Sequence, residues 1–169
     1  KEFSQKIDKV VFPGLQGGPH INQIAAVAMA LEEASKPAFK KYAEQVVKNA
    51  KALALEIQKA GWRVISNGTD THLFLVDVWQ NGQKGISGGK EASDLLEKVG
   101  IIVNKNAIPY DLRSPIDPSG IRIGAPAITT IGMKEKDMKQ IAGWINDVLT
   151  KSKKCATIKK EVLTFLSRF

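Results

Sequence analysis

The chain has 169 residues, of which 43% are apolar and 25% charged, and its formal net charge is +8. These fractions are ordinary for a globular protein and exclude a disordered chain. One cysteine and two histidines exclude an internal disulfide framework and a cysteine-rich or histidine-rich metal site, so no metal is expected.

The first distinctive stretch is "VFPGLQGGPH", residues 11–20, where glycines and prolines stand beside an aromatic side chain. It leads into a helix predicted to begin near Ile21. Backbone N–H groups at a helix N-terminus attract phosphate, so Gly17 and Gly18 form a candidate phosphate site, with a plain turn as the alternative. His20 is interpreted as a helix cap rather than a catalytic group.

Two helices follow. Residues 21–35 have apolar side chains at helical spacing and end before Pro37, which disfavours helical backbone in the residue that precedes it. From Pro37 an apolar repeat at three and four residues continues for more than six turns, to a stop at Gly61. The pattern predicts a helix of about 23 residues, long enough to bridge two lobes.

Lysines on the long helix are spread among glutamates, as in "KKYAEQVVKNAK", and aromatic side chains do not interleave with them as a stacking platform would need. A surface that tracks nucleic acid would need such aromatic platforms. The basic residues therefore indicate solvated helix faces, and a surface that attracts a small acidic molecule is the alternative.

The pattern then changes to short β-rich runs. "WRVIS" (62–66) and "HLFLVDV" (72–78) predict two strands around a turn, with His72 hydrogen-bonded at a strand end. A helix capped by Ser87 follows and ends at Gly100.

Two more strands are predicted, "IIVN" (101–104) and "GIRIG" (120–124), and then helices over 134–151 and 156–169. Mixed elements around a few strands favour the α+β class: a small mixed sheet with helices packed on one side.

Arg122 is the most informative polar residue because it lies in an apolar strand between Ile121 and Ile123. An arginine there is costly unless its planar fork meets a carboxylate or phosphate. Two partners remain open: an acidic side chain of the same domain, or a ligand's carboxylate.

Three polar residues, Asn104, Lys105 and Asn106, come directly after the apolar run "IIV" of the strand predicted at 101–104. Amide side chains at a strand end can hydrogen-bond a heteroaromatic ligand, and local turn bonding is an equal alternative.

No secretory signal is visible, and no apolar run approaches the roughly 20 residues of a membrane span. The sequence therefore predicts a cytoplasmic protein without a membrane partner. The first residue is Lys1 rather than a methionine, so we expect the chain to be a piece of a longer protein.

Four stretches, "VFPGLQGGPH", "GTDTHLFLVDV", "VNKNAIPYD" and "SGIRIGAPAITT", resemble in order and spacing the C-terminal portion of serine hydroxymethyltransferase. That family interconverts serine plus tetrahydrofolate with glycine plus 5,10-methylenetetrahydrofolate, using pyridoxal 5'-phosphate on a fold type I scaffold. The resemblance implies that 1–36 end the large cofactor domain, 37–61 form an interdomain helix and 62–169 form the small C-terminal domain.

The resemblance also implies residue roles. Arg122 would bind the carboxylate of the amino-acid substrate. Gly17 and Gly18 would approach the cofactor phosphate of a neighbouring subunit in a homodimer or tetramer. The residues implied to lie by the folate are Phe12, Lys105 and Asn106.

The family's Schiff-base lysine, in a "T-H-K" stretch, is absent from these residues, so the isolated chain is predicted to be inactive.

Ala125 and Ile131 stand where the family usually has Thr and Arg, which leaves the hydrogen bonding near Arg122 open. The alternatives are a non-catalytic module that binds folate or nucleic acid, and a fragment of another fold type I enzyme such as an aminotransferase. The aminotransferase alternative does not explain why the chain contains "VFPGLQGGPH".

Overall fold

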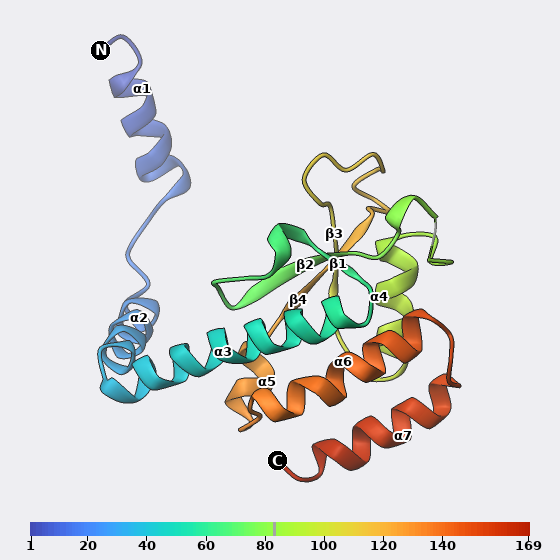
Figure 1. The fold of residues 1–169 in the computed structure, drawn as a ribbon. Coiled ribbons are helices and arrows are strands. Elements are labelled where there is room, and N and C mark those ends of the chain that lie inside the picture. Colours follow the sequence, from blue (N-terminus) through green and yellow to red (C-terminus); the bar gives the residue numbers. More distant parts are fainter. Residues whose placement is uncertain (83) are drawn as a thin grey trace. The chain divides into compact units, whose positions relative to one another are not determined.

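A computed structural model of the chain describes residues 1–82 and 84–169 (Figure 1). It divides into two compact units, residues 1–40 and 41–169. The dividing point lies inside a helix. The assignment of 1–36, 37–61 and 62–169 to three parts of a larger enzyme stays a prediction.

The first unit is helical. It contains α1 (Ser4–Lys9), a wider helical turn over Val10–Leu15 and α2 (Ile21–Ala34). The turn is broken at Phe12, whose backbone is extended at φ −135° and ψ 123°. The prediction of a helix from Ile21 is confirmed, whereas the six residues of α1 are too few for an apolar period to reveal them.

Helix α3 (Pro37–Lys59) has 23 residues, as the apolar repeat predicts. Gly61 lies just past its last residue and stops it, with a φ of +86° in the left-handed conformation that glycine adopts without strain. The N–H of Trp62 returns to the carbonyl of Ile57 at 3.2 Å and closes the last turn. One face of α3 is buried; its apolar members are Val46, Ala50, Leu53, Ala54 and Ile57.

Four strands form one sheet in the order β1-β2-β4-β3. They are β1 (Arg63–Val64), β2 (Leu73–Asp77), β3 (Asn104–Asn106) and β4 (Gly120–Gly124). Every pairing is antiparallel, so the expectation of a mixed sheet is wrong. The reason is topological: a helical crossover makes β3 run parallel to β2 but not next to it, and β4 fills the gap in the reverse direction, a split βαβ arrangement.

Two of the predicted strands are displaced or shortened. The run at 62–66 pairs only over Arg63–Val64, because the chain turns at Ser66, where φ is +59°. The run at 101–104 pairs only from Asn104 onward. The N–H of Ile101 is already bonded to the carbonyl of Leu96, at the end of the preceding helix, and is therefore not available to the sheet.

Four helices complete the second unit: α4 (Gly89–Lys98), α5 (Pro126–Thr130), α6 (Glu135–Leu149) and α7 (Cys155–Leu166). The predicted cap by Ser87 is wrong. Gly88 occupies the cap position without a side-chain bond, and the N–H of Ser87 donates to Oε2 of Glu91 at 2.7 Å. Short 3-10 turns at Ile65–Asn67 and Gln80–Gly82 connect the other elements.

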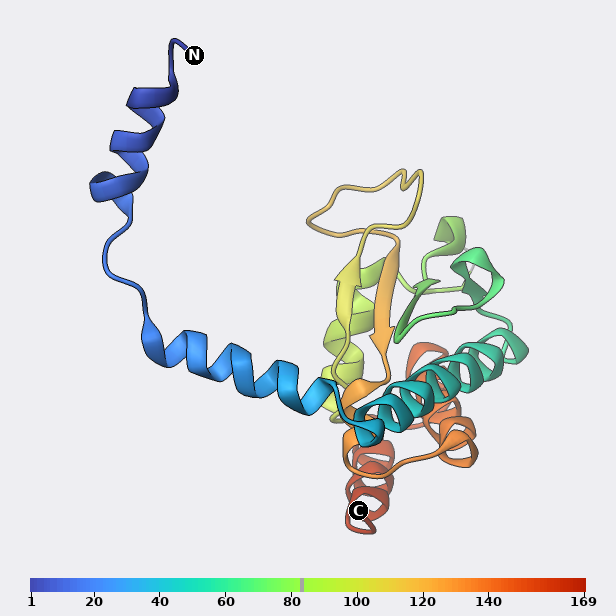
Figure 2. The ribbon, with the colours of Figure 1, turned by 90° about the vertical axis from the view of Figure 1, so that its left-hand side faces the viewer.

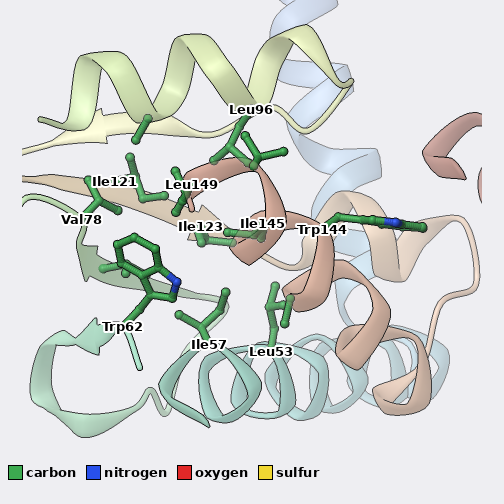
Figure 3. Close-up of a cluster of buried hydrophobic side chains, with 14 of the residues drawn as sticks. Leu53, Ile57, Trp62, Val78, Leu96, Ile121, Ile123, Trp144, Ile145 and Leu149 are labelled. Carbon is green, nitrogen blue, oxygen red and sulfur yellow. The ribbon is translucent and has the colours of Figure 1, made fainter. Parts of the chain in front are cut away.

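The core lies between the helices and one face of the sheet. Side chains alternate along β2 and β4, and Phe74, Val76, Ile121 and Ile123 point into the core. Figure 3 shows side chains of α3, α4 and α6 converging on these strands. Helix packing on one side is confirmed within this unit, and each fully buried aliphatic side chain stabilises it by roughly 1.5–3 kcal/mol.

The loop between β3 and β4 extends from the end of the sheet that lies away from α6 and α7 (Figures 1 and 2). It spans residues 107–119 and exposes three large apolar side chains at its surface, those of Tyr110, Leu112 and Ile116.

Candidate anion-binding site on the open face of the sheet

Arg122 is the central residue of β4 and lies on the face of the sheet opposite the helical core. Its two strand neighbours are buried, but its own side chain is exposed. The expectation of an arginine in an apolar interior is therefore wrong. Side chains alternate across a strand, so the burial of Ile121 and Ile123 directs Arg122 outward.

The guanidinium has one polar neighbour across the strand. Asn104 of β3 is paired with Arg122 in register, and Nη2 of Arg122 donates to Oδ1 of Asn104 at 3.1 Å. Among residues 1–82 and 84–169, the ion pairs within 4.0 Å do not include Arg122. The alternative of an intradomain salt bridge is thus not found in the described residues, and the charge of this arginine is not neutralised there.

Arg122 borders an open hollow of about 330 Å³. This volume is at the lower end of the range of small-molecule sites. The hollow combines a cation, an amide, an imidazole and apolar side chains, a set suited to a small organic anion. Its other lining residues are His72, Leu73, Ile102, Val103, Asn104 and Gly124.

The next two residues of β3 are held by local hydrogen bonds. Nζ of Lys105 donates to the carbonyl of Ile116 at 2.6 Å, and Nδ2 of Asn106 donates to the carbonyl of Ala107 at 2.7 Å. Lys105 is paired with Ile121, so it lies on the other side of the strand from Asn104. The structure places both residues at the base of the 107–119 loop, and their role beside folate stays a prediction.

Asp111 organises that loop, a function that the sequence analysis missed. Its carboxylate accepts hydrogen bonds from the N–H groups of Ile108 and Arg113 and from both the N–H and the hydroxyl of Ser119, at 2.6–3.2 Å. Burial by itself would raise the pKa of Asp111, but the bonds from Ser119, Arg113 and Ile108 outweigh it, and the pKa is lowered. The visible signal was an aspartate inside a proline-punctuated loop.

A second contact set holds the far side of the loop. Arg113 forms an ion pair with Asp117 and donates from Nε to the carbonyl of the same residue at 3.0 Å. Its guanidinium also lies over the ring of Trp79, 5.0 Å from the ring centre. The polar residues of the loop thus hold its backbone in place, and its large apolar side chains are exposed at the surface.

The remaining predicted site residues belong to the first unit. Phe12 is 65% exposed. Gly17 and Gly18 border a hollow of about 480 Å³ at the start of α2. A Cβ at either glycine would meet nothing within 4 Å, and neither has a left-handed φ, so the fold of this unit does not itself require glycine there.

The predicted cap by His20 is wrong, whereas His72 is hydrogen-bonded at a strand end as predicted. His20 stands at the cap position of α2, but its side chain makes no capping bond; its carbonyl accepts from Gln23 and Ile24 instead. The carbonyl of His72 accepts from the N–H of Ala125 at 2.9 Å, and its exposed side chain borders the Arg122 hollow.

The two departures from the usual family pattern lie in different surroundings. Ala125 is fully buried and packs with Val46 and Ala50, where a hydroxyl would need a partner. Ile131 is 44% exposed at the end of α5.

No helix in residues 1–82 and 84–169 has the length and apolar character that crossing a membrane requires. The same residues contain no group of three or more His, Cys, Asp or Glu side chains arranged to hold a metal ion.

Fold and site together define an α+β domain whose sheet presents an arginine with an unneutralised charge beside a hollow. A family model described as serine hydroxymethyltransferase matches residues 1–145, and the chain belongs to this family. The serine hydroxymethyltransferases of Acidobacterium capsulatum and Koribacter versatilis are 57% and 54% identical to it over 149 residues. Each match covers 88% of this chain but 34% of the relative, so the chain spans about a third of their length.

Proposed function

We propose that the protein carrying this chain is a pyridoxal-phosphate-dependent serine hydroxymethyltransferase (EC 2.1.2.1) of one-carbon metabolism. It would interconvert serine plus tetrahydrofolate with glycine plus 5,10-methylenetetrahydrofolate. Family membership supports this reaction, and the observation that carries it is the unneutralised guanidinium of Arg122 beside a hollow. The isolated chain, which lacks the family's cofactor-binding lysine motif, would be inactive.

Arg122 would bind the α-carboxylate of the amino-acid substrate. A guanidinium presents a planar fork that matches a carboxylate with two parallel hydrogen bonds, and such charge-assisted bonds are about twice as strong as neutral ones. One Nη of Arg122 is held by Asn104, which leaves the other N–H groups for the ligand. The apolar side chains around the hollow would reduce competition from water.

The residues at the start of α2 fit a phosphate. Glycines without a Cβ let the backbone approach an anion, and N–H groups at a helix N-terminus are good phosphate donors. Gly17 and Gly18 would contact the phosphate of the cofactor bound by a neighbouring subunit, in a homodimer or tetramer. When bound, pyridoxal phosphate supplies an electron sink for bonds to the α-carbon of the amino acid.

Folate would be contacted by Phe12, Lys105 and Asn106. The exposed ring of Phe12 offers a flat apolar surface to a pterin, and the short bonds of Lys105 and Asn106 fix the end of β3. The cytoplasmic location also stays a prediction.

A chimaeric enzyme tests the proposal. The matching third of the Acidobacterium capsulatum relative is replaced by this chain, and folate-dependent serine cleavage is measured. The chimaera should be active, and Arg122→Ala should raise the KM for serine by about 100-fold or more, because the substrate carboxylate would lose its charge partner. Arg168→Ala removes an exposed arginine from the end of α7 and should leave the KM unchanged. An unchanged serine KM in Arg122→Ala would refute the carboxylate role.

The net charge of +8 favours one other candidate, a non-catalytic module that binds nucleic acid. A surface that neutralises phosphates loses affinity steeply as salt rises. Binding of a polynucleotide to the chain, measured between low and physiological salt, separates the two: the enzyme proposal expects weak binding without a steep salt dependence, together with an active chimaera.

A further inference from the structure

The cross-strand pairing gives Arg122 two different flanks. In the register of the sheet, Leu75 of β2 lies on one side of it and Asn104 of β3 on the other. Leu75 offers no hydrogen-bond acceptor in its side chain. Asn104 therefore decides how the guanidinium is held within the strand.

The partner on that flank is a neutral acceptor. The amide oxygen of Asn104 accepts one N–H of Arg122 at 3.1 Å. A guanidinium has five N–H donors, so one such bond restrains its plane and leaves four donors for another acceptor. A carboxylate in the same position would restrain it equally but would also neutralise its charge.

Restraint without neutralisation matters for binding a small anion. A free arginine side chain loses rotamer freedom when it is ordered by a ligand, and that loss weakens binding. A bond that already exists before the ligand arrives removes part of this loss. Because the charge stays uncompensated, the attraction for a carboxylate is retained.

The surroundings of Arg122 and Asn104 also leave the charge of the arginine uncompensated. Ile102 and Val103 precede Asn104, and Leu73 lies opposite Gly124, so the other polar groups of the hollow are few. Within residues 1–82 and 84–169, the hollow is lined by no acidic side chain. Asn104 is thus the polar side chain that meets Arg122 there.

We propose that Asn104 is a positioning residue: its amide oxygen orients the Arg122 guanidinium for a ligand carboxylate while leaving the cation's charge intact. This inference rests on the proposed carboxylate-binding role of Arg122. It also revises the sequence-based hypothesis for Asn104, whose amide oxygen is directed to the arginine rather than held ready for a heteroaromatic ring.

The test uses this chain and two readouts by NMR: the rotation of the Arg122 guanidinium, seen in its nitrogen-bound protons, and the shifts of those protons on titration with acetate. Acetamide serves as the uncharged probe. The variants are Asn104→Ala, Asn104→Asp, Arg122→Ala and, as an amide control, Gln140→Ala on the exposed side of α6. Backbone spectra report whether each variant is folded.

Asn104→Ala should speed guanidinium rotation and weaken acetate binding several-fold. Asn104→Asp should keep the rotation slow yet weaken acetate binding more than Asn104→Ala does, because the cation is then neutralised. The Gln140→Ala chain and the unsubstituted chain should behave alike, and acetamide should not reproduce the acetate shifts.

Each contrary result has a separate meaning. Unchanged rotation and acetate affinity in Asn104→Ala, or undiminished affinity in Asn104→Asp, would overturn the positioning role and leave the carboxylate role of Arg122 standing. Acetate binding that survives Arg122→Ala, or is absent from the unsubstituted chain, would overturn the carboxylate role and the inference with it.

Discussion

Gly89, the first residue of α4, packs directly against Gly120, the first residue of β4. A Cβ on Gly89 would collide with the carbonyl oxygen of Gly120, and the N–H of Gly89 donates to the carbonyl of Pro118 at 2.6 Å. The backbone of the helix thus touches the backbone of the strand that carries Arg122. This approach fixes the distance between α4 and the sheet.

We expect Gly89→Ala to destabilise the second unit by about 1–3 kcal/mol, because the added methyl meets backbone that cannot move aside. Gly143→Ala is the matched control: Gly143 is a helical glycine on the exposed side of α6, with nothing within 4 Å of an added Cβ. That variant should be stabilised by roughly 0.5–1 kcal/mol. Urea unfolding followed by circular dichroism measures the free energy of unfolding of both variants. Equal values for Gly89→Ala and Gly143→Ala would contradict the close contact between Gly89 and Gly120.

A buried amide joins α3 to the segment after β4. Asn49 is fully buried, and its Nδ2 donates to Oγ1 of Thr129 and to the carbonyl of Met133, both at 2.9 Å. Asn49→Leu should lower the free energy of unfolding by about 1–3 kcal/mol, since it leaves a buried carbonyl without its partner. Gln45→Ala, which removes a half-buried amide bonded to Asn49, should cost less. Urea unfolding of the two variants tests whether Asn49→Leu lowers the free energy of unfolding more than Gln45→Ala does.

Periodicity was enough to predict the longer elements. The apolar repeat of α3, the alternation of β2 and the glycine stop at Gly61 follow from the preferences of residues close in sequence. The positions of Ser87 and Asn104 did not follow in this way. Gly88 and Gly89 enter α4 because that helix touches β4, which is a tertiary effect. Strand β3 begins late because the N–H of Ile101 closes the end of α4 on Leu96, a local bond that the apolar pattern does not reveal.

For the site, the sequence identified Arg122 but misjudged its surroundings. Counting apolar neighbours suggested burial, whereas the period of two in a strand places Arg122 and Ile121 on opposite faces. The partner Asn104 is 18 residues away, and its pairing depends on the loop that Asp111 holds. Such a relationship between distant residues is not contained in local spacing.

Acid should weaken one contact near the start of α4. The N–H of Ser87 and the ammonium of Lys151 lower the pKa of Glu91 from its ordinary 4.5 to about 2. A carboxylate with a depressed pKa in the folded state stabilises it fully above the ordinary value, and this contribution is lost as pH falls from about 4.5 toward 2. Stability should therefore decline over this range.

Glu91→Gln should cost on the order of 1 kcal/mol at neutral pH and flatten the decline between pH 4.5 and 2. Glu97→Gln, an exposed glutamate of the same helix, should leave the decline as it is in the unsubstituted chain. Urea midpoints measured at several pH values provide the comparison. A decline of the same steepness in Glu91→Gln would show that other carboxylates are responsible.

The composition of α2 predicts self-association of the isolated chain. Its residues 25–31 contain no polar side chain, and none of its side chains is buried within the first unit. A helix that is apolar on all sides is normally enclosed by protein, and exposed apolar area of this kind favours association. Sedimentation should therefore show species larger than a monomer as concentration rises.

Val27→Lys should reduce the amount of these larger species, because a charge on α2 opposes its burial against another copy. Thr164→Lys, on the exposed side of α7, should not reduce it. A sedimentation coefficient that stays monomeric at every concentration would contradict the prediction.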